Sequence, residues 1–209
     1  MVDNGSIYAG TNKYVFITQN LGSSWLKAST GLPSSPIRSL VYSGLNLIAG
    51  TDNGGFISTN NGEDWKPCTT GLFNRNVFSI TSKDSFVIAA TDNGVYESIN
   101  YGFDWTPYNT GLTNLFVNSA ILLDSNLYAA TLGGVFVSTN YGISWSVSNV
   151  GLANTYIWST VVNGSNHFAA AGTPGVYKST DNGKSWKTCN SGLKNYYVYS
   201  LATEKSFVF

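Results

Sequence analysis

Hydrophobic residues occur along the chain in short runs that are separated by turns rich in Asn and Gly. Asn-Gly between two short apolar runs is the strongest local signal of a β-hairpin, because a tight primed turn needs positive φ angles. No segment places apolar residues at the spacing of an amphipathic helix. One period therefore predicts four strands: IRSLVY at 37–42, LIAGT at 47–51, FIST at 56–59 and WKPCT at 65–69.

This pattern recurs along the whole chain. Five tryptophans are spaced by 40, 40, 40 and 41 residues: Trp25, Trp65, Trp105, Trp145 and Trp186. A Gly-Leu pair follows each of them at the same spacing, from Gly31-Leu32 to Gly192-Leu193. A four-stranded unit of this size cannot bury both faces alone, whereas radial stacking covers each sheet with its neighbours. We predict an all-β fold, a β-propeller of five four-stranded antiparallel blades in a single domain over residues 1–209.

The segments that end on these tryptophans carry a specific resemblance. They read TQNLGSSW, STNNGEDW, SINYGFDW, STNYGISW and STDNGKSW. They resemble the Asp-box, or BNR, repeat, which occurs in sialidases, sortilin-type receptors, some glycoside hydrolases and the photosystem II assembly factor family. The resemblance covers essentially the whole chain and implies that each box is the turn between the third and fourth strands of a blade. The box residues are Asn20, Trp25, Asn60, Trp65, Asn100, Trp105, Asn140, Trp145, Asp181 and Trp186.

A structural role is the expected one for these boxes. A short Asn or Asp side chain accepts hydrogen bonds from turn amides, Gly permits the left-handed conformation, and Trp holds the turn onto the sheet. At the third position of the box four of the five repeats have Asn, and only the fifth has an acidic residue, Asp181. Calcium favours charged oxygen ligands, so we expect no metal site and no cofactor.

The two ends of the chain are in phase with each other. Residues 202–209 align with residues 1–8, and Tyr197–Thr203 has the pattern of the inner strand that the first blade lacks. One interpretation is a closing blade that the N- and C-terminal strands share, which removes open edges and gives a monomer. The other is a segment of a longer repeat array, or an engineered repeat product, whose open edges form a homo-oligomer.

Charge and composition exclude several classes of protein. Eleven basic residues balance eleven acidic ones, and only Arg38 and Arg75 are arginines, so we expect no nucleic-acid surface. No apolar run is long enough to span a membrane. The first residues lack the pattern of a signal peptide. The compartment is unknown, although the family resemblance favours a secreted or cell-surface protein.

Catalytic groups are few. The sialidase resemblance implies three arginines on a substrate carboxylate, and this chain has two. Asp52 and Asp92 are the best pair for a glycosidase, but both lie in Thr-Asp-Asn-Gly turns where Asp caps backbone amides. We expect the single histidine, His167, to be a solvated turn residue. Cys68 and Cys189 occupy equivalent places in distant repeats, so we predict two free thiols packed as small apolar residues and no disulfide.

The repeats differ most where the chain enters the inner strand. Five unlike side chains occupy one position of the period: Arg38, Phe78, Asn118, Trp158 and Tyr199. They are flanked by Arg75, Phe116, Tyr156 and Tyr196. Aromatic faces beside hydrogen-bonding groups suit sugar rings or extended peptides, and the alternative is that these side chains fill a narrow channel. The alternation of strands places this surface on the face opposite the boxes.

Together these features predict a non-catalytic binding or scaffold propeller for a protein, peptide or glycan. The alternatives are a carbohydrate-active enzyme or sugar-binding domain, and a repeat fragment or engineered propeller with no ligand of its own.

Overall fold

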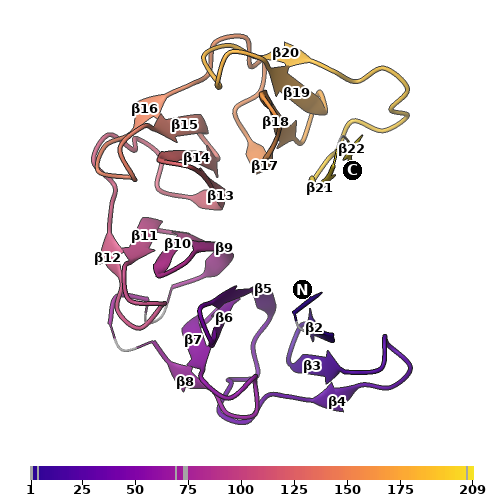
Figure 1. The fold of residues 1–209 in the computed structure, drawn as a ribbon. Helices are drawn as coiled ribbons and strands as arrows, with labels where there is room; N and C mark the ends of the chain where they lie inside the picture. The colour runs from indigo at the N-terminus through magenta and orange to yellow at the C-terminus, as the bar shows by residue number, and fades with distance from the viewer. Residues whose placement is uncertain (1, 4, 69, 73–74, 206) are drawn as a thin grey trace. The chain divides into compact units, whose positions relative to one another are not determined.

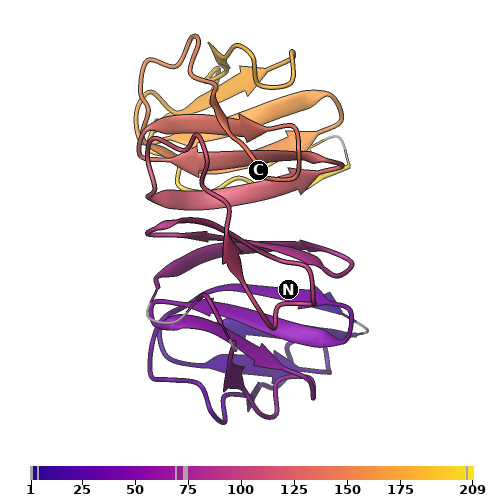
Figure 2. The same ribbon diagram turned by 90° about the vertical axis from the view of Figure 1, so that its left-hand side faces the viewer.

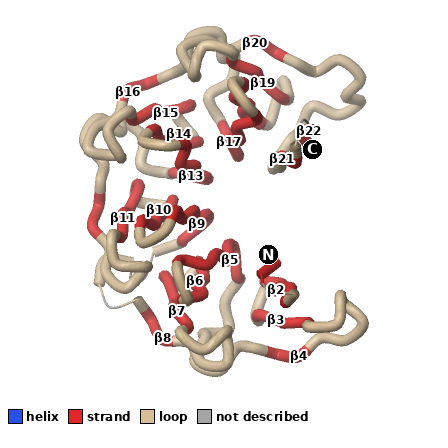
Figure 3. Tube along the Cα trace, viewed as in Figure 1, coloured by secondary structure: helices blue, strands red, loops and turns tan. Residues whose placement is uncertain are grey.

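The computed structural model describes residues 2–3, 5–68, 70–72, 75–205 and 207–209. Met1 and Thr69, the predicted ends of two segments, lie outside these residues. The described residues form β-strands, turns and loops (Figure 3). None of them belongs to a helix that could cross a membrane. The all-β prediction is therefore confirmed.

The described strands make five four-stranded antiparallel sheets and one two-stranded sheet, each with its strands in chain order (Figures 1 and 2). The first two sheets contain β1 Val2–Asp3, β2 Ser6–Gly10, β3 Val15–Thr18 and β4 Leu26–Lys27, then β5 Ile37–Ser43, β6 Asn46–Thr51, β7 Gly54–Ser58 and β8 Lys66–Pro67. The third contains β9 Val77–Lys83, β10 Phe86–Thr91, β11 Gly94–Ser98 and β12 Thr106–Pro107. The fourth contains β13 Val117–Leu123, β14 Asn126–Thr131, β15 Gly134–Ser138 and β16 Ser146–Val147. The last two contain β17 Ile157–Asn163, β18 Asn166–Ala171, β19 Val176–Ser179 and β20 Lys187–Thr188, then β21 Thr203–Glu204 and β22 Phe207–Val208.

The four strands predicted for one period are thus observed, with a fourth strand of only two residues. The turn between β7 and β8 contains Asn61 with φ 57° and Gly62 with φ 88°. Positive φ at this Asn-Gly pair is what the sequence pattern requires.

The chain forms two compact units, residues 1–92 with 96–107 and residues 93–95 with 108–209. In the first unit β2 packs beside β5, and β5 beside β9. In the second unit β17 packs beside β13, β14 and β21. Apolar side chains fill the spaces between neighbouring sheets within each unit, because each strand points alternate residues at its two faces. Examples are Leu47 and Phe56 in the first unit and Ile157 and Tyr177 in the second.

The described strands do not show the predicted shared blade. The inner position of the first sheet is held by β1, whose Val2 and Asp3 pair with Ile7 and Ser6 of β2. Among the described strands β21 pairs only with β22, and the paired residues there are Thr203 with Val208 and Glu204 with Phe207. The in-phase sequences at the two ends therefore form two hairpins of the same register, and a closing blade that both ends share stays a prediction.

Candidate functional site

A β-bulge in the inner strand positions the predicted binding residues. Ile157 pairs with Ala171 and Ser159 with Ala170, so Trp158 is an extra residue without a cross-strand partner. The same irregularity occurs in β5, β9 and β13, where the extra residues are Arg38, Phe78 and Asn118. A bulge turns the side chain of its extra residue out of the pleat, and bulges are frequent at functional sites. The position that varies most between repeats is therefore the one that the backbone frees from sheet pairing.

In each sheet this bulge lies at the end opposite the turn between the third and fourth strands, because the strands alternate in direction. We call those five turns, at 18–25, 58–65, 98–105, 138–145 and 179–186, the box turns. In the second of them Asn60 Oδ1 accepts hydrogen bonds from Ser58 Oγ at 2.9 Å and from the Asp64 amide at 3.0 Å. The Gly62 amide donates to Ser58 Oγ at 2.8 Å. The side chains of the box turns are thus engaged in holding their own backbone.

The fifth box turn uses a carboxylate for the same purpose. Asp181 accepts from Ser179 Oγ at 2.7 Å and from Ser185 Oγ at 2.6 Å. These hydroxyl donors hold the pKa of Asp181 well below its usual range. Where the box residue is Asn100, its amide instead donates to Asp104 Oδ2 at 2.9 Å. In the fifth box turn the residue four positions later, Ser185, donates to the box residue. In the third box turn the box residue, Asn100, donates to the residue four positions later.

In the first unit the bulge residue Arg38 is bound to the turn between the second and third strands. Its Nε and Nη2 donate to the two carboxylate oxygens of Asp52, each at 2.8 Å. These bonds raise the pKa of the guanidinium, and the Arg38 side chain remains half exposed. Both oxygens of Asp52 are thereby occupied by one arginine.

The other candidates of the first unit are more enclosed. Asp92 Oδ2 accepts from Asn76 Nδ2 at 2.7 Å. Arg75 and Phe78 are half-buried, and the Arg75 carbonyl accepts the Gly54 amide at 2.9 Å. Asp52 and Asp92 therefore each have a partner consistent with a turn-stabilising role.

In the second unit the bulge residue of β17 is aromatic, and it lies beside the residue that follows β18. Trp158 and Tyr199 meet edge to face with ring centroids 5.5 Å apart. A Cβ placed on Gly172 would lie 3.6 Å from Trp158 Nε1 and 3.7 Å from Tyr197 Cε1. Gly172 occupies the place in β17–β18 that Asp52 occupies in β5–β6. We call Trp158, Gly172, Tyr197 and Tyr199 the aromatic cluster.

The chain segments that carry these rings share a local device. Asn154 Oδ1 accepts the Tyr156 amide at 2.8 Å, and Asn195 Oδ1 accepts the Tyr197 amide at 2.9 Å. Asn114 holds the Phe116 amide in the same way at 3.0 Å. Such Asx turns fix a loop through its own side chain. Segments without regular secondary structure thus present their rings from defined backbone positions.

Much of this aromatic surface is open to solvent. Tyr199 is 63% exposed, Tyr197 60% and Tyr156 56%, while Trp158 is half-buried. Phe116 and Tyr196 are exposed by 37% and 48%. Asn118 instead turns inward, and its Nδ2 donates to the Ile157 carbonyl at 2.8 Å. The surface therefore offers flat apolar faces with phenol and indole hydrogen-bonding groups at their edges.

Sequence reasoning missed Tyr197 and Gly172 as parts of this surface. Tyr197 follows Asn195 as Tyr156 follows Asn154, so the Asn-x-aromatic spacing is a signal that could have identified it. Gly172 stands 14 residues after Trp158, as Asp52 stands 14 residues after Arg38. That shared offset is the corresponding signal for a residue paired with the bulge.

Two expectations for single residues are wrong. His167 lies in β18 and is 2% exposed, at 4.5 Å from the Tyr128 ring by centroids, and burial lowers its pKa. Cys189 is exposed, whereas Cys68 is buried and burial raises its pKa to about 12. Both thiols are free. His167 occupies the core position that Leu127 holds one repeat earlier, so the repeat phase outweighs the local turn composition.

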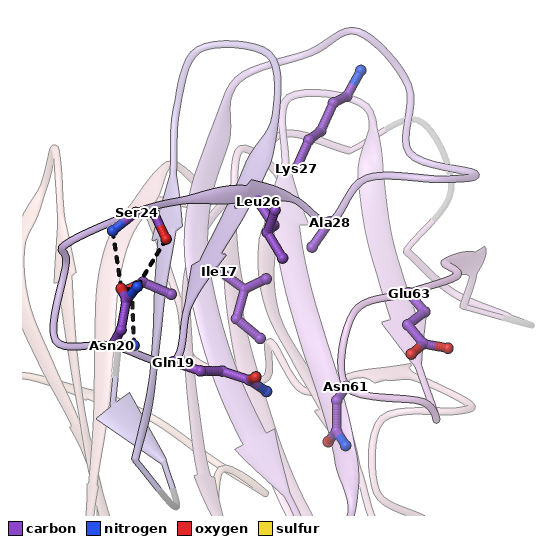
Figure 4. A pocket seen from close by; sticks show the side chains of 10 residues that line it. Ile17, Gln19, Asn20, Ser24, Leu26, Lys27, Ala28, Asn61 and Glu63 are labelled. Atoms are coloured by element: carbon purple, nitrogen blue, oxygen red, sulfur yellow. Dashed lines mark hydrogen bonds between the residues drawn. The ribbon is translucent and has the colours of Figure 1, made fainter.

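A pocket of about 510 Å³ lies near the first box turn (Figure 4). Asn20 and Ser24 line it and are already bonded to each other, with Asn20 Nδ2 donating to Ser24 Oγ at 2.8 Å. Lys27, also in its lining, has its Nζ 3.6 Å from the Tyr14 ring centroid. No group of three His, Cys, Asp or Glu side chains suited to a metal ion occurs within the described parts of the chain. Asn20, Ser24 and Lys27 in this lining therefore have structural partners.

Comparison with known proteins identifies the fold. No family model and no curated protein matches the sequence. An ancestral GH74 enzyme superposes with a TM-score of 0.76 at 20% identity, over 94% of this chain and 31% of that one. YCF48 from Cyanidioschyzon merolae gives 0.73 at 14% identity, over 98% and 75%. The WD40 β-propeller domain of Doa1 gives 0.71 at 14% identity, over 97% and 70%.

These similar structures are β-propellers, and the sheets described above share their architecture. The chain spans about a third of the length of the GH74 enzyme it resembles. Identities of this size show the fold alone.

Proposed function

We propose that this chain is a non-catalytic binding or scaffold module built from Asp-box repeats, and that it binds a ligand through the aromatic cluster. The observation that carries the proposal is the bulged Trp158 packed with Tyr199 and beside Gly172 on an exposed aromatic surface. Large exposed aromatic patches on soluble proteins commonly mark interaction sites. The five box turns, with their shared hydrogen bonds, support the assignment to Asp-box repeats.

A glycan or an extended peptide is the ligand class that this surface suits best. Aromatic faces stack on the flat apolar faces of sugar rings or on proline and aromatic side chains. The indole nitrogen of Trp158 and the tyrosine hydroxyls add directional hydrogen bonds at the edge of the same faces. No charged side chain belongs to the aromatic cluster, which favours an uncharged ligand.

The alternative function is that of a carbohydrate-active enzyme, which the GH74 similarity brings into consideration. A glycosidase needs one carboxyl group to donate a proton and a second to act as base or nucleophile. Asp52 is held by both of its oxygens on Arg38, and Asp92 accepts from Asn76. These contacts favour the binding module over the enzyme.

A binding screen tests the proposal. The immobilised protein would be exposed to a glycan library and a peptide library, with Trp158→Ala and Trp25→Ala as paired variants. Trp25 is 42% exposed in the first box turn, so its substitution removes an exposed indole that is not part of the aromatic cluster. We expect a ligand whose binding is lost in Trp158→Ala and kept in Trp25→Ala. Binding that survives Trp158→Ala would contradict this surface.

The enzyme alternative has its own assay. Polysaccharides would be incubated with wild type, Asp52→Asn and Asp92→Asn, and released reducing ends would be measured. We expect no hydrolysis by any of the three proteins. Hydrolysis by wild type that either substitution abolishes would overturn the non-catalytic proposal.

A further inference from the structure

Trp65, Trp145 and Trp186 each make the same two hydrogen bonds to the repeat before them. The Trp65 amide donates to the Thr30 carbonyl at 2.8 Å, and its indole Nε1 donates to the Ala28 carbonyl at 3.0 Å. In the second unit Trp186 donates in the same way to Val150 and Ser148, at 2.8 and 2.9 Å. These three box tryptophans thus bind the main chain of the repeat before them.

A glycine makes room for this contact. A Cβ at Gly31 would collide with the Trp65 carbonyl, and one at Gly151 would collide with the Trp186 carbonyl. Around these bonds lies an apolar interface in which Leu47, Phe56 and Trp65 are at most 7% exposed. One repeat contributes the tryptophan side of the interface and the preceding repeat contributes the glycine side.

The tryptophan side of the first sheet is exposed. Trp25 is 42% exposed, whereas Trp65, Trp105, Trp145 and Trp186 are 3% or 4% exposed. Ile7 and Phe16 are half-buried, while their equivalents in the next repeat, Leu47 and Phe56, are buried. This edge is an apolar surface with the composition of an interior repeat interface.

The fifth sheet presents the glycine side. Nothing lies within 4 Å of a Cβ placed on Gly192, although its φ of 86° matches those of the interior glycines. Leu193 is 40% exposed, against 1% for its equivalent Leu72, and Cys189 is exposed where Cys68 is buried. The β21–β22 hairpin covers the inner part of this sheet, through Asn163 Nδ2 donating to the Phe207 carbonyl at 3.0 Å. The outer part remains open.

We infer that the tryptophan edge of one copy of this chain binds the glycine edge of a second copy, head to tail. In that contact the Trp25 amide and indole Nε1 donate to the carbonyls of Ser191 and Cys189, which correspond to Thr30 and Ala28 in the interior interface. The box turn and β3 of the incoming copy cover the outer part of the fifth sheet. The apolar side chains of both edges leave water, which supplies the driving force.

The chemistry of the partner follows from the interior interfaces, which recur in both units with one geometry. Because the contact joins two different edges, each copy keeps one edge open. A head-to-tail contact of this kind can therefore extend to further copies as well as form a dimer. This inference does not depend on a ligand at the aromatic cluster.

Sedimentation velocity over a concentration series of the 209-residue chain tests the inference. We expect the mass to rise with concentration to a dimer or larger species. Trp25→Ala removes the indole, and Gly192→Ala places a Cβ where the Trp25 carbonyl would sit. Each should weaken association by roughly tenfold or more, because buried aromatic anchors dominate interface energies.

Two control variants separate association from folding. Gly5→Ala imposes the same left-handed strain at φ 84° with nothing within 4 Å of the new Cβ, and Leu26→Ala shortens a side chain of β4 that is 72% exposed. Both should associate like wild type. A chain that stays monomeric at every concentration overturns the inference, as does association that neither Trp25→Ala nor Gly192→Ala weakens beyond the effect of its control.

Discussion

The indole nitrogen of Trp158 lies 3.6 Å from the point where a side chain at Gly172 would begin. In the second sheet the equivalent pair is Arg38 and Asp52, joined by two hydrogen bonds. Bulge residue and turn residue are therefore matched within each of these two sheets: a cation with a carboxylate, and a large ring with the smallest residue.

Gly172→Leu tests this relationship. A branched side chain must enter the space against Trp158 and Tyr197, and we expect it to lower the free energy of unfolding by about 1–3 kcal/mol through overpacking. Gly172→Ala adds only a Cβ at ordinary contact distance and should change that free energy by less than about 0.5 kcal/mol. Urea unfolding curves measure both. Equal stability of the two variants would show that the rings do not pack on this residue.

The hydrogen bond between the box residue and the residue four positions later predicts how a carboxylate at the box position changes stability. In wild type, Asn60 Nδ2 donates to Asp64 Oδ2 at 3.2 Å. Asn60→Asp places a second carboxylate there, which should cost about 0.5–1 kcal/mol at pH 7 through like-charge repulsion. Asp181→Asn should leave the unfolding midpoint unchanged, because Ser185 can then accept as Ser144 does from Asn140. An Asn60→Asp variant as stable as wild type at pH 7 contradicts this account.

A buried carboxyl group in β11 predicts a pH dependence between about pH 4.5 and pH 7. Glu97 is 8% exposed, its Oε2 has no hydrogen-bond partner, and burial raises its pKa from 4.5 to about 7. The folded protein therefore binds this proton more tightly than the unfolded chain, so stability falls as the pH rises from about 4.5 through 7. Glu97→Gln should be more stable than wild type at pH 8 by about 1–2 kcal/mol, and the difference should shrink at pH 5.

Thermal unfolding of wild type and Glu97→Gln over this pH range measures the difference. A constant difference between the two proteins from pH 5 to pH 8 would mean that Glu97 does not titrate in the folded state as its burial implies.

His167 predicts the opposite slope below neutrality. Burial lowers its pKa from 6.5, partly offset by a hydrogen bond with Asn182 and by the charge of Asp181. The unfolded chain then binds this proton more tightly, so stability falls as the pH drops below 6.5. His167→Leu restores the residue type of position 127 and should remove about 1 kcal/mol of the loss between pH 7 and pH 5. Identical acid unfolding of both proteins is the contrary result.

The repeat made much of the fold predictable. The spacing of Trp25 to Trp186 places every box turn, and the apolar runs around residues 37–67 give four strands close to the observed bounds. His167 was misplaced because its local composition resembles a turn, whereas its burial depends on Tyr128 of the preceding sheet. Sequence phase shows that the two end segments are equivalent, and both form a hairpin, but phase alone does not show which strand completes the first blade.

The candidate site was only partly predictable. The variable position of the period contains Trp158 and Tyr199, and both lie in the aromatic cluster. The bulge that exposes position 158 leaves no mark in the apolar pattern, because it is a feature of the pairing between β17 and β18. Gly172 carries no side chain from which a role could be inferred, and its importance comes from the rings packed beside it.

The most direct test of the proposed function is a calorimetric titration of a glycan or peptide selected by the binding screen. Wild type would be compared with Trp158→Ala, Tyr199→Ala and the conservative Gly172→Ala. We predict that each ring deletion weakens the affinity by roughly tenfold or more, since buried aromatic anchors dominate such contacts, and that Gly172→Ala binds like wild type. Unchanged affinity in Trp158→Ala and Tyr199→Ala would contradict the assignment of binding to the aromatic cluster.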